Sequence, residues 1–515
     1  MKKNSTPEFK TAKAALAGAM QLHQNGDLDA ANELYSKTLE IEPKNPRALR
    51  LKGILKRENG DIKQSISLLE HAAAISPKDV APFNELALSQ ISAGDFNDAE
   101  KTFRQALKIA PKNLVSLTNL GALLHHQGHI NEAIKCYSAL LKEQPDDINV
   151  RCNFAKALVD AGQETDALQA CERAINDSNA HPYALAIKGA VLIDLERFEE
   201  AKKILLSATQ ETQDDDIAFI NLALCLDELK DTNAAIELLQ KALEINPLNA
   251  RAVSDLANCL IKVNQTESAI NLCEGFLQKF PGECLILASY ALALSAAGKN
   301  SLASELTDYK RLAKTFKLNS FITDNQKNSI NATLAQLIRE DQSLLQNPLS
   351  KSTIGGSQTG ELNLDATLEF SELKNFLENS ITSAVEEYKT EFQSTHPILK
   401  AGSDRWSLRS WATLLNPGGR QAPHMHPIGW LSGVYYVEIP NLTNEKDVNA
   451  GSLLFGPAPD RFSQKKTNLT YHEPIEGQLV LFPSWLWHQT IPFQSNGQRI
   501  SIAFDVLPNN ILRQI

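Results

Sequence analysis

Residues 80–113 have the sequence VAPFNELALSQISAGDFNDAEKTFRQALKIAPKN. This segment contains two stretches in which apolar residues recur at helical spacing, with Gly94 between them and Pro111 after the second one. Glycine and proline are the residues that most often end helices, because glycine adopts left-handed backbone angles and proline lacks an N–H group. The segment therefore predicts a helix, a tight turn and a second helix.

The same pattern recurs along the first part of the chain. Prolines are spaced by 34 residues (77 − 43 = 34), and the series resumes after three further intervals, at Pro43, Pro77, Pro111, Pro145, Pro247 and Pro281. Two columns of small residues follow the same period: Ala19, Gly53, Ala87, Gly121, Ala155, Gly189, Ala223, Ala257 and Ala291; and Ala31, Ser65, Ala99, Ala133, Ala167, Ala201, Ala235, Ala269 and Ala303. Small side chains let two helices approach closely, so we expect nine stacked helix pairs over residues 12–317.

This arrangement resembles the tetratricopeptide repeat in its period, in its small residues at the eighth and twentieth positions and in its proline at the thirty-second. Asn179, Gln213 and Thr315 replace that proline in three units. The resemblance implies an α-solenoid whose inner helices line a concave groove for a protein or peptide partner. We read residues 1–11 as an N-terminal leader and residues 318–349 as a capping helix and linker.

Three asparagines at the sixth position of their repeats are candidates for peptide binding. Asn119, Asn153 and Asn221 would project from the inner helices, where side-chain amides can bond to the backbone of an extended peptide. Asp255 occupies the same position in a later repeat. The alternative is that these are solvated polar residues on an exposed face.

The composition changes near residue 350. All five tryptophans lie beyond residue 405, and residues 350–360 are rich in Ser, Thr and Gly, which predicts a loop entering a second domain over residues 350–515. A helix is expected at residues 369–391. Aromatic and β-branched residues predict strands at residues 405–416, 430–438, 452–455, 478–482 and 498–506. Closely spaced strands without helices between them indicate an antiparallel sandwich or barrel.

Three histidines of this second domain are candidate metal ligands. His424 and His426 are two residues apart, so in extended backbone both imidazoles point to one side and can reach one ion. His488 follows a predicted strand that ends at Pro483. Three neutral imidazoles suit iron, zinc, copper or nickel, so the ligands alone leave the metal open.

An arginine and a serine further along share one face of the last predicted strand. Arg499 and Ser501 alternate with apolar residues that form the other face. A buried guanidinium is costly unless an anion meets it, and its shape fits a carboxylate with two hydrogen bonds. We therefore expect a cosubstrate carboxylate there. Trp411, Trp430 and Tyr436 are candidates for the wall of a substrate pocket and equally good core residues.

These motifs together resemble a known family. His424-x-His426, the segments SGVYY (432–436) and GSLLF (451–455), the stretch from Gly477 to His488, and Arg499-x-Ser501 are similar to the bacterial 2-oxoglutarate- and Fe(II)-dependent oxygenases. The resemblance implies a double-stranded β-helix (jelly roll) that binds Fe(II) and 2-oxoglutarate. It also implies that His424 and His488 bind iron, and that Arg499, with Ser501 beside it, binds the distal carboxylate of 2-oxoglutarate. The implied reaction converts 2-oxoglutarate to succinate and carbon dioxide and hydroxylates a C–H bond.

The motif departs from the general pattern at His426, because this superfamily has a carboxylate at that position. Either His426 is the third ligand, or a carboxylate from elsewhere completes the site. Glu438 and Asp460 are the nearest candidates in sequence. We favour His426.

The remaining features bound the function. The chain of 515 residues has a formal net charge of −10, which makes it a poor binder of nucleic acid or anionic membranes. It shows no apolar signal segment and no long apolar run, so we expect a cytoplasmic protein. Three hypotheses stay open: a protein or peptide hydroxylase whose repeats recruit substrate, an oxygenase of a small metabolite whose repeats serve assembly, and a repeat scaffold without catalysis.

Overall fold

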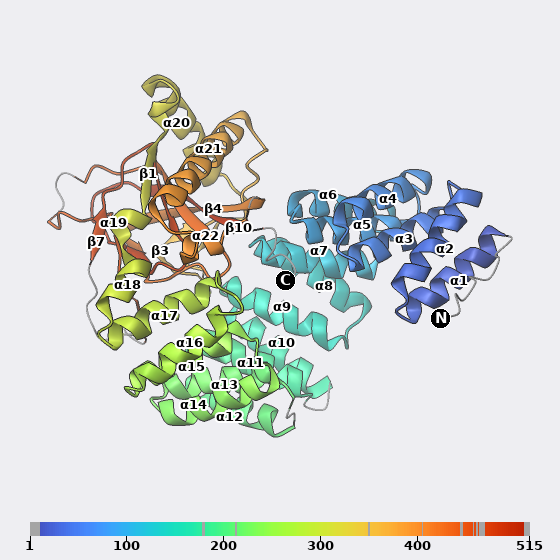
Figure 1. Cartoon of the computed structure of the whole chain (residues 1–515), viewed down its shortest axis with the longest axis horizontal. Coiled ribbons are helices and arrows are strands. Elements are labelled where there is room, and N and C mark those ends of the chain that lie inside the picture. The colour runs from blue at the N-terminus through green and yellow to red at the C-terminus, as the bar shows by residue number, and fades with distance from the viewer. Residues whose placement is uncertain are drawn as a thin grey trace. The chain divides into compact units, whose positions relative to one another are not determined.

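The computed structural model describes residues 11–177, 181–211, 214–348, 351–403, 405–442, 446–456, 458–459, 462 and 469–508. Among these residues the chain divides into two compact units (Figure 1). The first contains the residues up to His126 together with Lys135–Glu143. The second contains Gln127–Ile134 and the described residues from Gln144 onward.

The first unit consists of helices from successive repeats. They are α1 (Ala12–Gln24), α2 (Leu28–Ile41), α3 (Pro46–Glu58), α4 (Ile62–Ile75), α5 (Val80–Ala93), α6 (Phe96–Ile109), α7 (Leu114–His126) and most of α8 (Ile130–Glu143). The first helices of the pairs begin 34 residues apart, as at Ala12 and Pro46. A Cβ atom added to Gly53 would lie 2.7 Å from Leu69 Cγ of the second helix. This close approach explains the small residue at the eighth position of the repeat.

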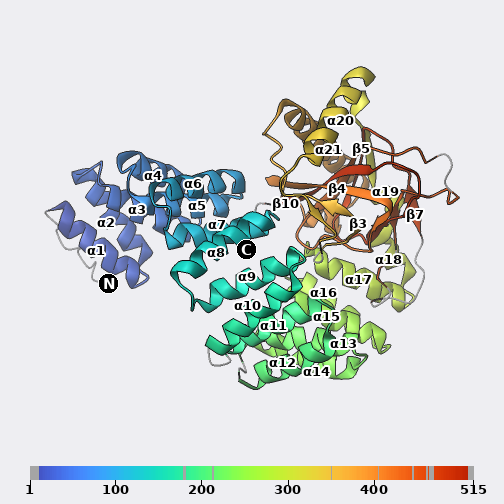
Figure 2. The ribbon, with the colours of Figure 1, turned by 180° about the vertical axis from the view of Figure 1, so that it is seen from behind.

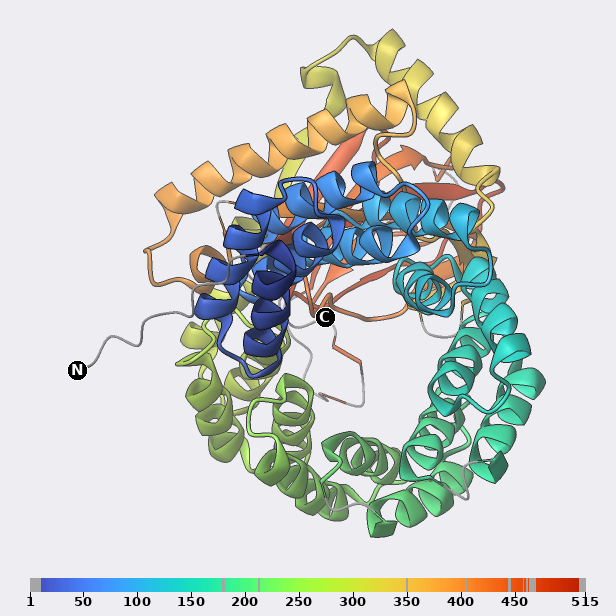
Figure 3. The ribbon, with the colours of Figure 1, turned by 90° about the vertical axis from the view of Figure 1, so that its right-hand side faces the viewer.

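The second unit begins with helices of the same kind. They are α9 (Ile148–Asp160), α10 (Glu164–Asp177), α11 (Pro182–Asp194), α12 (Phe198–Glu211), α13 (Asp216–Glu228), α14 (Thr232–Ile245), α15 (Ala250–Lys262), α16 (Thr266–Leu277), α17 (Cys284–Ala296) and α18 (Asn300–Thr307). Figure 3 shows this series, coloured from cyan to yellow-green, stacked along an arc. The chain therefore contains a helical-repeat solenoid, as the sequence predicted.

The end of the repeat region differs from the expectation. After α18 come the short helix α19 (Tyr309–Leu312), strand β1 (Lys314–Lys317) and the 3₁₀ turn η1 (Leu318–Ser320). Strand β1 occupies residues that the sequence assigned to the ninth repeat, and it pairs with a strand of the C-terminal sheet. Thr315 stands here in place of the repeat proline, so every residue of this segment has the N–H group that strand pairing requires.

Helix α20 (Asp324–Arg339) lies where the sequence predicted a capping helix, but its main contacts are with the C-terminal domain. Its buried face includes Ile330, Leu334 and Ile338. Asn331 Oδ1 accepts a hydrogen bond from the Tyr435 hydroxyl over 2.6 Å. These contacts place α20 beside the sheet, next to β5.

Two antiparallel sheets form the C-terminal domain (Figure 2). Within the described residues the larger has seven strands in the order β1-β8-β5-β10-β4-β3-β2, and the smaller has three in the order β7-β6-β9. The strands after β1 are β2 (Leu345–Gln346), β3 (Thr353–Gln358), β4 (Trp406–Gln421), β5 (Leu431–Glu438), β6 (Leu453–Phe455), β7 (Thr470–His472), β8 (Gln478–Pro483), β9 (His488–Thr490) and β10 (Arg499–Pro508). Two helices lie between β3 and β4, α21 (Leu368–Glu391) and α22 (Pro397–Lys400).

The segment expected to be a loop at residues 350–360 is largely a strand. Strand β3 pairs with β4, with a β-bulge between Ile354 and Gly356. A Cβ atom on Gly356 would lie 2.3 Å from the carbonyl oxygen of Leu414, so only glycine permits this approach. The glycines that predicted a loop are required here for close strand pairing.

The last repeats and the sheets share one hydrophobic core in the second unit. Trp485 Nε1 donates to the carbonyl oxygen of Leu306 over 3.0 Å, and the Tyr388 hydroxyl donates to the Leu312 carbonyl over 2.6 Å. The predicted boundary at residue 350 therefore does not separate two independent cores. Of the helices that the structure describes, none combines the length and apolar character needed to cross a membrane.

Candidate metal centre

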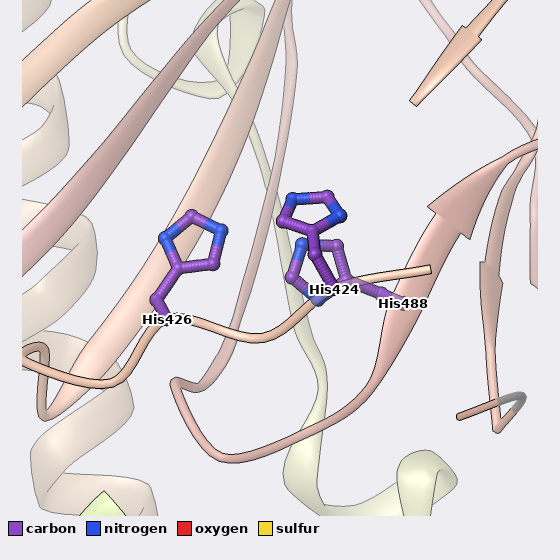
Figure 4. A group of neighbouring side chains, drawn as sticks. All are labelled: His424, His426 and His488. Carbon is purple, nitrogen blue, oxygen red and sulfur yellow. The ribbon is translucent and has the colours of Figure 1, made fainter. Parts of the chain in front are cut away.

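Backbone hydrogen bonds bring the three predicted histidines together. His424 and His426 lie in the connection between β4 and β5, and His488 begins β9. The backbone N–H of each of His424 and His488 donates to the carbonyl oxygen of the other, both over 2.9 Å, and the N–H of His426 donates to Ser484 O over 3.0 Å. One nitrogen from each ring lies within 4.8 Å of the others (Figure 4). Three ligand atoms at this spacing can hold one metal ion.

The second nitrogen of each ring is occupied by an acceptor. His424 Nδ1 donates to Ala422 O over 2.8 Å, and His488 Nδ1 donates to Leu486 O over 2.9 Å. His426 Nδ1 donates to Asp505 Oδ1 over 2.6 Å. A carbonyl or carboxylate oxygen can only accept, so each Nδ1 carries a proton, and Nε2 is the ring nitrogen left for a metal. This is the tautomer that a metal requires.

Burial keeps the imidazoles of His424 and His488 neutral. Desolvation and the neighbouring His426 ring lower the pKa of His424 to about 3. Desolvation, together with His424 and His426, holds the pKa of His488 well below its usual value. Neutral imidazole is the form that binds metal, so both rings are ready to act as ligands at neutral pH.

Asp505 is a functional residue that the sequence interpretation missed. Burial alone would raise the pKa of its carboxyl, but His426 and a 2.7 Å hydrogen bond from the Ser432 hydroxyl lower it overall. Ser432 Oγ also lies 2.8 Å from Ser484 Oγ. This network orients the His426 ring, as carboxylates commonly do for metal-binding histidines. Asp505 falls on the same alternating face of β10 as Arg499, and that periodicity could have identified it.

The two carboxylates considered from the sequence do not enter this cluster. Glu438 accepts from Arg339 Nη2 over 2.6 Å, at a partly exposed position. Asp460 lies outside the described residues. Among the residues that the structure describes, the group of possible metal ligands consists of His424, His426 and His488.

Arg499 is buried beside Ser501 on β10. Its side chain is 1% exposed, its Nη1 donates to Ser501 Oγ over 3.3 Å, and its guanidinium lies 5.0 Å from the ring centroid of Tyr436. Arg499 Nε and the Tyr436 hydroxyl lack hydrogen-bond partners within the described part of the chain. Burial lowers the pKa of Arg499 and raises that of Tyr436. Among the residues that the structure describes, no acidic side chain pairs with the Arg499 guanidinium, so the site is complementary to an anion.

A cavity of about 400 Å³ opens beside the histidines, and His424, His426, Asp505 and Trp411 contribute to its wall. The Trp411 ring stacks on His426 with a centroid distance of 5.5 Å. Trp430 is instead a core residue that donates from Nε1 to Ile398 O over 2.7 Å. Of the three predicted pocket residues, Trp411 lines this cavity, whereas Tyr436 lies against Arg499.

The three asparagines of the predicted groove have different environments. Asn119, in the first unit, and Asn153, in the second, are half-buried. Asn221 is 4% exposed, and its Oδ1 accepts from Arg251 Nη2 over 3.5 Å. The buried Ile187 occupies the same repeat position between Asn153 and Asn221. The amides therefore do not form an uninterrupted ladder.

The fold and site define a helical-repeat protein with a C-terminal sheet domain that carries a cluster of three histidines able to hold a metal ion. Family models agree with both parts. A model described as "Putative 2OG-Fe(II) oxygenase" matches residues 409–505. A model for the tetratricopeptide repeat matches residues 22–87 and 90–151, and one for the N-terminal TPR repeats region of Psidin matches residues 151–269. The chain thus has tetratricopeptide repeats in its N-terminal region and a C-terminal domain of this oxygenase family.

Solved structures resemble the repeat region at low identity. A tetratricopeptide repeat protein from Parabacteroides merdae ATCC 43184 is 14% identical, covers 48% of this chain and 98% of its own, and has a TM-score of 0.43. MamA protein is 18% identical over 33% of this chain and 93% of its own, with a TM-score of 0.31. YrrB, a TPR protein with an unusual peptide-binding site, is 20% identical over 36% and 95%, with a TM-score of 0.28. A comparison with curated proteins finds no match.

Proposed function

We propose that this chain is a 2-oxoglutarate- and Fe(II)-dependent oxygenase that acts as a hydroxylase, with repeats that bind a protein or peptide. One observation carries the proposal. Strand β10 presents on one face a buried guanidinium without an acidic partner, at Arg499, and the carboxylate of Asp505 that holds a histidine of the metal cluster. Strand β10 thus carries both an arginine that can bind an anion and the aspartate that supports the metal cluster. This arrangement suits a cosubstrate that binds the arginine through one carboxylate and also binds iron.

The proposal includes the finer features of the fold. The two antiparallel sheets represent a double-stranded β-helix, and helices α1–α18 represent nine repeats, the last of them shortened at α18. Three imidazole ligands can bind Fe(II) as well as several other divalent metal ions. The family match over residues 409–505, which include every proposed ligand, favours iron.

The side chains have separate roles in this scheme. His424, His426 and His488 hold the ion through Nε2, and Asp505 keeps the His426 ring in place through Nδ1. When bound, iron and 2-oxoglutarate would supply the oxidising chemistry with O2 as the oxidant: one oxygen atom would enter a C–H bond of the substrate, and the other would enter the succinate that 2-oxoglutarate forms as it loses carbon dioxide. Arg499 binds the distal carboxylate of 2-oxoglutarate.

The neighbouring side chains complete the pocket. Ser501 lies beside Arg499 and contributes a hydroxyl group to the same carboxylate site. Ala503 lies between Ser501 and Asp505 on the same face of β10, where its small, half-buried side chain leaves space. Trp411 stacks on the His426 ring and covers one side of it.

The direct test is metal binding. Substituting His424→Ala together with His488→Ala should abolish stoichiometric Fe(II) binding, measured by anaerobic dialysis and metal analysis, because two of three ligands are lost. His472→Ala is the matched control, since His472 is in the same domain but outside the cluster. Unchanged metal content in the double variant would contradict the proposal and favour a scaffold without catalysis.

Substrate class is tested by succinate release from 2-oxoglutarate, with and without a peptide library. Peptide-stimulated release is expected for a protein or peptide hydroxylase. Release that responds only to small metabolites would favour the alternative in which the repeats serve assembly. If the substrate is a peptide, replacing Asn119, Asn153 and Asn221 together by Ala should raise the KM for that peptide more than it lowers kcat. Contacts far from the reacting carbon stabilise the bound substrate and the transition state equally.

A further inference from the structure

The cavity at the metal centre has a wall that comes from the repeat region. Gln127 and Gly128 form the turn between α7 and α8, and both belong to the second unit. Both residues line the same cavity as His424 and His426. The repeat region therefore contributes residues directly to the space where a substrate would meet the metal.

Gln127 is buried in an unusual way. It is 2% exposed, and neither its Oε1 nor its Nε2 has a hydrogen-bond partner among the residues that the structure describes. Leaving a buried amide without partners is costly, and native proteins seldom tolerate it. Because Gln127 is a lining residue of the cavity, a ligand there is the candidate partner for this buried donor and acceptor.

The backbone holds this amide firmly in the wall. The N–H of Glu361 donates to Gln127 O over 2.6 Å. Gly128 has a φ of +80°, and a Cβ atom there would lie 3.1 Å from Gly360 Cα. The turn can approach residues 360–361 this closely only because both positions are glycine. The backbone of the turn that carries Gln127 is therefore fixed in the cavity wall before any ligand binds.

The chemistry of the cavity indicates what Gln127 would bind. The nearby charges of Arg409 and Glu361 face each other, with Nε and Oε2 3.5 Å apart. A primary amide presents one acceptor and one donor side by side, and an amide group in a ligand offers the matching donor and acceptor. Neither a carboxylate nor a hydrocarbon can satisfy both atoms.

We infer that Gln127 is a substrate-binding residue that pairs with an amide group of the substrate next to the metal centre. The amide is either a peptide bond or a side-chain carboxamide. The inference rests on the proposed function and specifies its substrate class. It also assigns the repeats a direct contribution to the substrate site, in addition to binding along their groove.

The test uses the full chain loaded with Mn(II) and 2-oxoglutarate, because Mn(II) relaxes the NMR signals of ligand protons close to it. The probes are a pool of blocked hexapeptides, a matched pool without Asn and Gln, and the free amino acids asparagine and glutamine, whose side chains carry the carboxamide. Gln127→Met is expected to weaken binding by about tenfold or more, as two hydrogen bonds are lost. Gln90→Met is the matched control, since Gln90 also has an unpartnered Oε1 but lies outside this cavity.

The two amide sources give different results. Equal binding of the two hexapeptide pools indicates a peptide bond, and binding only of Asn- or Gln-containing probes indicates a carboxamide. A peptide pool with one ester in place of an amide allows a thermodynamic cycle, in which two ligands are compared on wild type and on Gln127→Met. The ester should weaken binding to the wild type but make little difference to Gln127→Met, because the partner of the missing N–H is already gone.

Stability separates this role from a structural one. Replacing an unpartnered buried amide with an apolar side chain should leave the melting temperature of the free protein unchanged or raise it. Equal probe affinity in wild type and Gln127→Met, or a melting temperature that falls in Gln127→Met but not in Gln90→Met, would overturn the inference. If Gln127→Met does not fold, Gln127→Leu, which also lacks both the donor and the acceptor, takes its place in the ester cycle.

The same measurements distinguish failure of the inference from failure of the proposed function. Binding of Mn(II) and 2-oxoglutarate to the wild type is recorded first. Absence of either would contradict the oxygenase proposal, while ligand-observed NMR on the metal-free chain still compares wild type with Gln127→Met. Normal binding of both with equal probe affinities contradicts the role of Gln127 alone.

Discussion

At the scale of single residues, Arg499 carries the strongest chemical consequence. Its guanidinium is 1% exposed with an unpartnered Nε, so the protein pays a desolvation cost that an incoming carboxylate would offset. Polar neighbours at hand are Ser501 and Tyr436. Among the described residues, no hydrogen bond or ring contact joins Arg499 to the three histidines, so the two sets of side chains can be tested separately.

Arg499→Met should weaken 2-oxoglutarate binding by about 1.5–3 kcal/mol, because a charge-assisted contact is lost. Metal affinity should stay unchanged. Both quantities are measured by isothermal titration with Mn(II) in place of iron. Ser501→Ala, which removes only the neighbouring hydroxyl, should give a smaller loss. Equal 2-oxoglutarate affinity in wild type and Arg499→Met would remove this residue from the cosubstrate site.

Asp505 bonds to His426 Nδ1, so we expect it to affect a bound metal through that ring. Asp505→Asn should reduce metal affinity by about 10–100-fold, the usual effect of removing a carboxylate that orients a metal-binding histidine. Competition with a chromogenic chelator measures the affinity. Ser432→Ala removes a donor to the same carboxylate and should have a weaker effect in the same direction. If Asp505→Asn binds metal as tightly as the wild type, the hydrogen bond to His426 has no role in the site.

At the scale of secondary structure, glycines decide how closely β3 approaches β4. A Cβ atom at Gly356 would lie 2.3 Å from Leu414 O and 3.1 Å from Leu415 Cα, and backbone atoms cannot move aside as a flexible side chain can. The edge of the larger sheet thus depends on a residue type with low strand propensity.

Gly356→Ala should lower the free energy of unfolding by about 1–3 kcal/mol, as overpacking does. All five tryptophans lie between Trp406 and Trp487, so tryptophan fluorescence during urea unfolding reports on this domain. Gly275→Ala in α16 is the control, because nothing lies within 4 Å of its added Cβ. That change should be neutral or stabilising by up to about 0.5–1 kcal/mol. Equal stability of Gly356→Ala and wild type would contradict the close approach.

At the scale of the whole molecule, the C-terminal sheets depend on residues of the repeat region. Strand β1 forms one edge of the larger sheet, and α20 covers part of it. Trp485 and Tyr388 donate to the carbonyl oxygens of Leu306 and Leu312. A cut at residue 350 would expose core residues of the sheet and leave these buried donors unpaired.

A chain truncated to residues 350–515 should therefore fail to fold cooperatively. A chain of residues 114–515 retains β1, α20 and Gln127, and it should keep a cooperative transition and Mn(II) binding. Near-UV circular dichroism and thermal unfolding followed by tryptophan fluorescence distinguish the two. A native-like spectrum and a sharp transition for residues 350–515 would show that the sheets are independent of the repeats.

Local patterns in the sequence were sufficient to predict the helix pairs, several strands and the main candidate site residues. The 34-residue period predicts the helix pairs because each unit packs mainly on its neighbours in the chain. The two-residue spacing of His424 and His426, and of Arg499 and Ser501, identifies shared faces because side chains alternate along extended backbone. The expected strands at residues 405–416, 430–438 and 498–506 coincide with most of β4, β5 and β10.

Contacts between distant parts of the chain needed the tertiary structure. The hydrogen bond from His426 to Asp505 joins residues 79 positions apart. Strand β1 pairs with β8, and the paired residues Lys314 and Leu481 are 167 positions apart. Glycines at residues 355–356 have the composition of a loop, yet their lack of a side chain is what permits strand pairing. Gln127 follows a helix in a repeat turn, and only its burial in the cavity wall distinguishes it from an ordinary exposed amide. Such roles depend on which surfaces meet after folding, and no local pattern records that.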